Sequence, residues 1–475
     1  MRHAVGWKPR TALVLAVVAC TSPRPPSPAT APRHGAAGDA LLTPESVERV
    51  AWLRAHASAL RSLDASDEDF SDLVPFGRAV GDARVVLLGE SAHGDGSTYL
   101  GKTRLVKYLH EKLGFDVLVF EAGLYEGSKA GETILADGDP MAALRMAVPP
   151  AWSWSGEIEP LAAYLTAQAH TAHPLLFEGY DPQGGSAIAR TRQSLELRAY
   201  LDSTGLGGRF AEDTSFWRGL FWLQRSYSSA DSLSIDSVRV DRFVDAADAM
   251  RAALAERSGA PRSRFWQQVL ESAMAYARQV RQARVQMAAK NSRSWTADNI
   301  REAQGARNIL WLANDRHRGH RLIVWLAAVH AARNITEVDT RDTAWSYAAY
   351  SPTGQHLWRA LGTQVYAVGF VALSGMSRLG PDSLIIRADQ HPDAEVEELI
   401  GAAGFETAFL DYRHIARGGE WLRTPLLSRP FAEHAKIARW PDVLDGIFFV
   451  RQMQPASWPN FEARLKASRP APDRE

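Results

Sequence analysis

The chain of 475 residues has a single cysteine, Cys20, and no net charge. A lone cysteine cannot form a disulfide within the chain, so its presence needs another explanation. Because 54 basic side chains balance 54 acidic ones, nothing in the composition suggests electrostatic attraction to a nucleic acid. No internal repeat is apparent, and the glycine patterns of phosphate-binding and dinucleotide-binding loops do not occur. What is present, 46% hydrophobic residues in a long chain, is typical of a globular protein with a large core.

The first 20 residues have the layout of a signal peptide. A basic region is followed by an apolar run from Thr11 to Ala19, which is too short to span a bilayer as a stable anchor. The run ends in small residues just before Cys20, which resembles a bacterial lipoprotein signal. We therefore predict that lipid attached to Cys20 links the protein to a membrane. The alternative is an ordinary signal peptide with a chance cysteine.

The residues after Cys20 predict the location of the protein and a tether. Position 21 is a threonine and not the aspartate that retains lipoproteins in the inner membrane. Resemblance to other lipoproteins then implies an outer-membrane anchor, with the protein facing the periplasm or the cell surface. Residues 21–40 are rich in proline, serine and alanine, a composition that predicts a tether with no core to bury.

The stretch from Arg84 to Gly123 predicts a strand, a helix and a second strand. Apolar runs from Val85 to Leu88 and from Val117 to Phe120 fit strands that are buried on both faces of a parallel sheet. Between them, apolar side chains recur at helical spacing, and Gly114 is placed as a C-cap. In such a unit both strands end at the same edge of the sheet, where open α/β sheets bind ligands.

Three polar side chains follow these strands closely. Glu90 and His93 come after the first strand, and Glu121 ends the second. Histidine titrates near neutral pH, and a neighbouring carboxylate can hold its tautomer and raise its basicity. Two carboxylates and an imidazole can therefore activate a water molecule or hold a metal. The alternative is a strand-end turn in which Glu90 only accepts backbone amides.

The sequence of this stretch resembles that of the erythromycin esterase family. The resemblance is carried by Gly-Glu-Ser-Ala-His-Gly at residues 89–94 and, after a helix, by Phe-Glu-Ala-Gly at residues 120–123. In that family a histidine acts as general base on a water molecule without an obligatory metal. The resemblance therefore implies that no cofactor is needed, that His93 is the base, and that Glu90 and Glu121 are its carboxylate partners.

The resemblance also suggests substrate-binding residues. Some members have arginine where this chain has Lys102. The family has tryptophans in a position similar to Trp154, which could form a pocket wall, although aromatic packing is the alternative. The acidic end of the strand that begins at Leu175 resembles another strand end of the family, which makes Asp181 a candidate.

Residues 186–317 predict a large helical insertion, because long alanine-rich helical patterns occur there without strand-like runs. Such an insertion could roof a pocket and exclude bulk water. The pair Arg301-Glu302 resembles an arginine–acid pair at the start of a family helix, so Arg301 could reach the reacting carbonyl or a carboxylate. A solvated arginine on a helix surface is the alternative.

The apolar run from Leu322 to Leu326 predicts the next strand, and His330 follows it. The family ends this strand with Trp-x-His-Asn-x-His. His330 occupies the place of the second histidine, whereas Ala327 stands at the first. We expect His330 or Arg301 to stabilise an oxyanion.

The predicted fold is α/β, with a mostly parallel central sheet, flanking helices and the large helical insertion. The domain is expected to span residues 41–455, and residues 456–475 to form a C-terminal tail. At the start of the domain, Thr43 can cap a helix that has Pro44 at its first position.

The resulting hypothesis is a small-molecule esterase that hydrolyses an ester or lactone with water activated at His93. Ser91 is disfavoured as a nucleophile, because the nucleophile elbow needs glycine two places later, where His93 stands. A metal or haem site would instead make the chain a binding protein without turnover, with Glu90, His93, Glu121 and His330 as the possible metal ligands. A lipoprotein that assists polysaccharide export is a further alternative from the wider family resemblance.

Overall fold

The computed structural model describes residues 43–226, 237–289, 294–342, 345–378, 385–387, 395–431 and 434–459. The predicted signal peptide, Cys20 and the tether lie outside the described residues, as does the predicted tail from residue 460 onward.

A mixed sheet runs through the molecule in the order β1-β8-β11-β6-β2-β5-β3-β4, with β7 paired to β6. Six neighbouring strands are parallel: β11 (Gly446–Met453), β6 (Val365–Arg378), β2 (Val85–Glu90), β5 (Leu322–Ala327), β3 (Val117–Gly123) and β4 (Leu176–Asp181). The remaining strands of the sheet pair antiparallel: β8 (Thr407–Asp411), β1 (Ser58–Ala59) and β7 (Ile385–Arg387). The prediction of an α/β fold with a mostly parallel sheet is confirmed.

The central strands are buried on both faces, so each strand sends alternate side chains into two separate cores. Val86 and Leu88 of β2 enter one core, whereas Val85 and Leu87 enter the other. The first core is covered by the helices α2 (Val74–Val80), α3 (Gly96–Leu113), α5 (Pro140–Ala147), α6 (Pro150–Ser153) and α7 (Glu159–Gln168). α4 (Leu124–Leu135) contributes to both cores. This burial explains the continuous apolar runs of the parallel strands.

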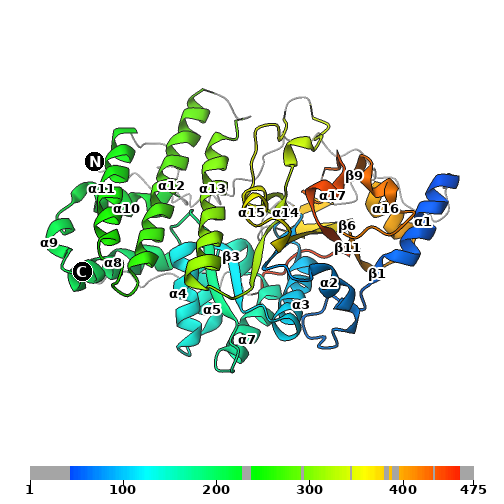
Figure 1. Ribbon diagram of the computed structural model, residues 1–475, viewed down its shortest axis with the longest axis horizontal. Coiled ribbons are helices and arrows are strands. Elements are labelled where there is room, and N and C mark those ends of the chain that lie inside the picture. The colour runs from blue at the N-terminus through cyan, green and yellow to red at the C-terminus, as the bar shows by residue number, and fades with distance from the viewer. Residues whose placement is uncertain are drawn as a thin grey trace, which may run out of the picture.

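The described residues between β4 and β5 form helices without strands, as the alanine-rich pattern predicted. The helices are α8 (Ser194–Ser203), α9 (Gly207–Phe210), α10 (Thr214–Ser226), α11 (Ser237–Ala255), α12 (Ser263–Ala288) and α13 (Thr296–Trp311), with π-helical turns at Ala189–Gln193 and Leu312–Arg316. Figure 1 shows α8 to α12 gathered at one end of the molecule, with α13 nearer the sheet. Together with α15 (Thr353–Leu361) they pack on the second core.

The opposite end of the molecule holds α1 (Pro44–His56) beside α16 (Glu395–Ala402) (Figure 1). The Thr43 hydroxyl accepts the backbone N–H of Ser46, and Pro44 stands in the first turn of α1. The predicted N-cap is therefore confirmed. Short elements complete the fold: α14 (Ala328–Ala331), α17 (Trp440–Val443) and the hairpin of β9 (Leu426–Ser428) with β10 (Lys436–Ala438).

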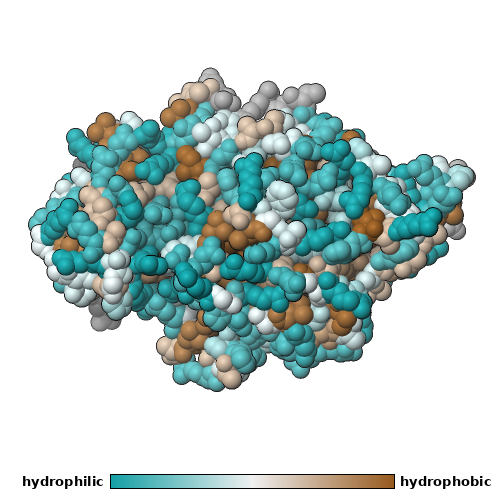
Figure 2. Space-filling model, in the orientation of Figure 1, coloured by the Kyte–Doolittle hydropathy of each residue, from teal (hydrophilic) through white to brown (hydrophobic). Residues whose placement is uncertain are grey.

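The surface in Figure 2 is mostly hydrophilic, with hydrophobic side chains in small separate patches. Among the described residues, no helix combines the length and the apolar character needed to cross a membrane.

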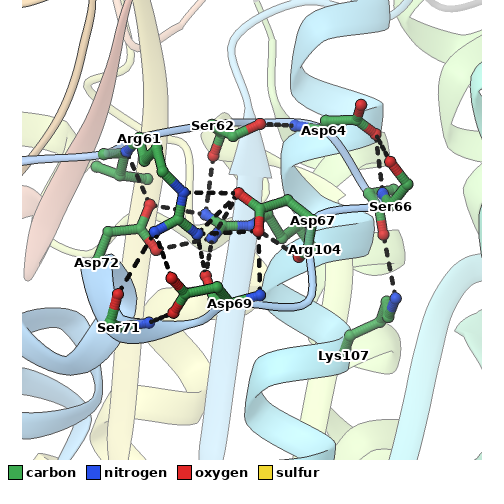
Figure 3. A network of polar contacts seen from close by, with 12 residues as sticks. Arg61, Ser62, Asp64, Ser66, Asp67, Asp69, Ser71, Asp72, Arg104 and Lys107 are labelled. Atoms are coloured by element: carbon green, nitrogen blue, oxygen red, sulfur yellow. Dashed lines mark hydrogen bonds and ion pairs between the residues drawn. The ribbon is translucent and has the colours of Figure 1, made fainter.

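A network of polar contacts connects helix α3 with the loop that precedes α2 (Figure 3). The Arg104 guanidinium, 1% exposed, donates to the backbone carbonyls of Ser62, Asp67 and Asp69 and to both carboxylate oxygens of Asp72. Arg61 lies at the outer side of the same loop, where it pairs with Asp67 and Asp69 and is 44% exposed. The loop is thus organised around a buried cation that belongs to the helix following β2.

We predict that Arg104→Lys lowers the free energy of unfolding by about 1–3 kcal/mol. A lysine cannot reproduce the planar fork of the guanidinium, so buried carbonyls and part of Asp72 lose their donors. Arg61→Lys is the control, because Arg61 is exposed and its ion pairs are screened by solvent, so they contribute little to stability. Urea unfolding of both variants measures the difference, and an equal loss in the two would contradict the buried role of Arg104.

Candidate active site

The carboxyl ends of four neighbouring strands bring the predicted polar residues to one edge of the sheet. Glu90 ends β2, Glu121 lies near the end of β3, and Asp181 ends β4. His330 lies on the single turn of α14, directly after β5. The pairing of β3 with β4 shifts register between Phe120 and Gly123, so Glu121 sits in an irregularity of the kind that re-aims side chains beside active sites.

The turn that carries His93 depends on two glycines. A Cβ at Gly89 would lie 2.5 Å from the Cα of Ala328, so only glycine lets α14 pass this close to β2. Gly94 has a φ of +84°, and a Cβ there would lie 2.1 Å from the carbonyl oxygen of Arg378. Glycine at these two positions therefore lets the backbone of Ala328 and of Arg378 pack directly against the turn.

Residues from the far end of the chain hold this turn in place. We call Gln454–Ser457 the C-terminal strap. The carbonyl of Gly94 accepts the N–H groups of Arg378 and Ala456, at 2.9 and 2.8 Å. The N–H of Gly96 donates to the carbonyl of Gln454 at 2.9 Å, and Ala456 is 1% exposed. The strap therefore packs into the folded domain.

Glu90 is the centre of the first half of the site. Its side chain is fully buried, and Oε1 lies 3.1 Å from Nδ1 of His93 and accepts Nε1–H of Trp152 at 3.0 Å. The ammonium of Lys102 binds the other oxygen. Burial by itself would raise the pKa of Glu90, but the charge of Lys102 and the contact with His93 outweigh it and hold the pKa below its ordinary value. Glu90 is therefore an anion aimed at His93.

Lys102 lies behind Glu90, and its side chain is fully buried. Its ammonium also donates to the carbonyl of Leu326 at 3.1 Å and lies over the ring of Trp325. Burial lowers the pKa of Lys102, and the charge of Glu90 counteracts only part of this effect. From this position Lys102 acts on the site through Glu90.

Arg301 joins two of the acidic strand ends. Its guanidinium donates to Glu121 at 2.8 Å and to Asp181 at 2.6, 3.1 and 3.2 Å. The side chain is 18% exposed, so the alternative of a solvated helix arginine is wrong. Burial would raise the pKa of Glu121, but His330 and Arg301 outweigh it and lower the pKa, with a smaller effect from His93. Both histidines therefore help to lower the pKa of Glu121.

His330 is held by side chains that the sequence did not assign to the site. Its Nδ1 lies 2.8 Å from Oε1 of Glu302 and 3.2 Å from the hydroxyl of Tyr350. Its Nε2 lies 3.6 Å from Oε1 of Glu121 and 3.4 Å from Arg301. Burial would lower the pKa of His330, but Glu302 and Glu121 outweigh it and raise the pKa above the ordinary 6.5.

Three residues of the site were not predicted: Trp152, Glu302 and Tyr350. Glu302 carried a usable signal, since it is the acid of the arginine–acid pair. The indole that contacts Glu90 belongs to Trp152, whereas Trp154, the predicted tryptophan, is buried at 8% exposure. Glu157 accepts the hydroxyl of Ser155 and the N–H of Ser457, which gives it a structural contact with the strap. Direct contact of Trp154, Asp181 and Lys102 with a substrate stays a prediction.

A small cavity of about 30 Å³ lies beside Asp181, on the side of the helical insertion. Asp181 forms part of its wall, together with apolar side chains of α4, α10 and α12, including Leu124, Leu223 and Val269. The insertion therefore lines a space next to the candidate site. Across the part of the chain that the structure describes, no group of three or more His, Cys, Asp or Glu side chains has a geometry that could hold a metal ion.

Comparison with known protein families matches most of the folded domain to one family model. The model described as erythromycin esterase matches residues 110–453, a range that starts within α3 and leaves His93 just outside. A Bacillus subtilis (strain 168) protein named "Putative hydrolase YbfO" is 24% identical over 430 residues, which cover 85% of this chain and 91% of that protein. Erythromycin esterase type II of Escherichia coli is 34% identical over 76 residues, or 16% of this chain and 18% of that enzyme.

Solved structures share the fold at low sequence identity. A Bacillus cereus protein superposes with a TM-score of 0.71 at 18% identity and covers 87% of this chain and 99% of its own. A succinoglycan biosynthesis protein has a TM-score of 0.68 at 18% identity, over 86% and 98% of the two chains. A mutant of the erythromycin esterase EreC in its open conformation has a TM-score of 0.61 at 16% identity, over 84% and 98%.

Proposed function

Because the chain belongs to the erythromycin esterase family, we propose that it hydrolyses an ester or lactone bond with a water molecule activated by His93. The contact between His93 and the buried carboxylate of Glu90 is the observation that carries this proposal. An ionised carboxylate can only accept, so Nδ1 of His93 donates to Glu90. Nε2 is then left as the acceptor that a general base requires.

The other charged groups support the same reaction. Glu121 lies near both histidines and can position the water, while its pair with Arg301 keeps it anionic. Arg301 and His330 supply positive charge for the oxyanion that develops when water attacks a carbonyl.

A panel of esters and lactones, incubated with purified protein whose metal content has been measured, tests the proposal. We expect hydrolysis of at least one substrate, without loss of activity after treatment with a chelator. Activity that disappears with the metal would favour the metal-dependent alternative. A protein that binds metal or haem and hydrolyses no member of the panel would overturn the proposed activity.

A role in polysaccharide export is a second candidate, favoured by the fold shared with a succinoglycan biosynthesis protein. That likeness is at 18% identity and concerns the fold alone. The two candidates differ in what they need from His93, since general-base catalysis fails without its imidazole and polysaccharide binding does not depend on a base. Measuring ester hydrolysis and polysaccharide binding with the same His93→Ala protein separates them.

We also propose that the protein is a lipoprotein anchored through Cys20 in the outer membrane. The support is the signal-like layout of residues 1–20 and the absence of any other cysteine. We expect Cys20→Ser to lose its lipid and to leave the membrane fraction when expressed in a Gram-negative host. Mass spectrometry of the mature N-terminus checks this, with His414→Ala, an exposed residue, as a control for expression. A mature wild-type protein that starts at an unmodified residue other than Cys20 would contradict the proposal.

A further inference from the structure

We propose that Trp152 is a positioning residue for the reaction, because its indole holds both the carboxylate of Glu90 and the imidazole of His93. This role rests on the proposed ester hydrolysis and adds the group that fixes the orientation of its base. Trp152 lies on the single turn of α6 and is 2% exposed, so its side chain belongs to the core beside the site.

Trp152 binds the same carboxylate oxygen as the histidine. Oε1 of Glu90 accepts Nε1–H of Trp152 at 3.0 Å and lies 3.1 Å from Nδ1 of His93. Lys102 binds the other oxygen. The last torsion of a glutamate side chain has only broad preferences, so the ammonium alone would leave Oε1 able to turn. The indole N–H therefore fixes the place of Oε1, which is the point where Nδ1 of His93 binds.

The indole also limits how the imidazole can turn. The rings of His93 and Trp152 have centroids 4.6 Å apart and planes at 70°, which is an edge-to-face contact. Phe120 of β3 supports the same indole, at 90° and with centroids 5.7 Å apart. The bond at Nδ1 fixes one atom of the imidazole, and the ring contact fixes its plane. Nε2, the acceptor for a proton of water, is thereby held in one direction.

Tyr99 connects the helix that carries Trp152 with the turn that carries His93. Its hydroxyl accepts the N–H of Gly94 at 2.6 Å and donates to the carbonyl of Ala151 at 3.3 Å. Gly94 follows His93 in the chain, and Ala151 precedes Trp152. Tyr99 is fully buried, so water does not compete for this link. The two rings are thus joined through their backbones as well as by direct contact.

Trp152→Phe tests the role, since it keeps an aromatic ring and removes the indole N–H. We expect kcat for an ester from the panel to fall by up to about 10²-fold, the cost of a misplaced catalytic group. KM should stay that of the wild type, because the indole contacts the base and not the substrate. An unchanged kcat, or a loss that lies in KM alone, would overturn the proposal.

Trp440 supplies a matched control. It also lies on a single-turn helix, α17, it is 1% exposed, and its Nε1–H donates to the carbonyl of Leu426 at 2.8 Å. Trp440→Phe therefore loses the same kind of buried hydrogen bond, but one to the backbone of β9. We expect this variant to keep the kcat of the wild type. A fall in kcat as large as that in Trp152→Phe would contradict the proposal, because loss of any buried indole bond would then lower the rate.

The tautomer of His93 gives a readout that does not depend on activity. Side-chain nitrogen NMR of the neutral imidazole shows which nitrogen carries the proton. We expect Nδ1–H, facing Glu90, in the wild type and a mixture of both tautomers in Trp152→Phe. Tyr99→Phe removes one oxygen and leaves the indole in place, so it should give a smaller change in the same direction. The wild-type tautomer in both variants would overturn the positioning role.

Failure of the proposed function has a different signature. Wild-type protein would then hydrolyse no ester, whereas the NMR spectra would still show whether Trp152 fixes the imidazole of His93. An active wild type, with unchanged kinetics and spectra in Trp152→Phe, would leave the hydrolysis standing and remove only the role of Trp152.

Discussion

Replacing His93 with alanine is expected to lower kcat/KM for ester hydrolysis by about 10²–10⁴-fold, the contribution of a well-placed general base. The imidazole is the group that removes a proton from water, and the carboxylate of Glu90 cannot replace it, because Glu90 is fully buried and bound to Lys102 and Trp152. Steady-state kinetics with an ester from the panel measures the effect.

The chain offers a close control for this substitution. His414 follows Asp411 by three residues at the end of β8, at 2.8 Å, just as His93 follows Glu90 at the end of β2. His414 is 63% exposed and far from the site in strand order, so His414→Ala should keep full activity. His93 is 22% exposed, so its variant should keep the melting temperature of the wild type within a few degrees. Full activity in His93→Ala would rule out water activation by this residue.

Macrolides are expected to be poor substrates. We expect their rate of hydrolysis to be about a hundred- to a thousandfold lower than that of an authentic macrolide esterase. The family pattern has a histidine at position 327, where this chain has alanine. The backbone N–H of Ala327 donates to Glu121 at 3.0 Å, so position 327 lies within the site. Loss of one donor to a developing oxyanion costs about 2.7–4 kcal/mol. Lys102 adds to the difference, because it cannot make the two-pronged contact of an arginine.

Ring opening of a macrolide with a fourteen-membered lactone, followed by mass spectrometry, measures this prediction. The erythromycin esterase EreC, which shares the fold, is the parallel enzyme. The ester that this chain hydrolyses best should be cleaved normally in the same preparation, which shows that the protein is active. Macrolide turnover as efficient as that of EreC would show that the alanine at position 327 does not matter.

The sequence was most informative where one local signal determines the structure. The apolar runs of β2, β3, β4 and β5 were identified because strands buried on both faces have no polar alternation. The motif at residues 89–94 could be placed at a sheet edge because its glycines and the helix after it leave few local structures open. Gly114 ends α3 with a φ of +65°, as its position after the apolar stripe predicted.

The missed features depend on contacts between distant parts of the chain. Glu302 lies beside its predicted neighbour Arg301, but only the fold shows that it faces His330. Tyr350 reaches His330 from the segment before α15, and no periodicity marks such a residue. Trp152 and Trp154 are two residues apart, and the direction of the single turn α6 decides which indole meets Glu90. The antiparallel pairing of β8 and the hairpin of β9 with β10 likewise depend on partners that local patterns do not reveal.

The C-terminal strap makes the turn that carries His93 depend on the last part of the folded domain. The backbone N–H of Gln454 donates to the hydroxyl of Ser97, and 357 residues separate the two. β2, which carries Glu90, lies between β5 and β6, and both of these strands are made long after it. Contacts of such long range form late in folding, because a large loop must close first. A shortened chain that contains His93 but ends before β11 and the strap is therefore expected to be inactive.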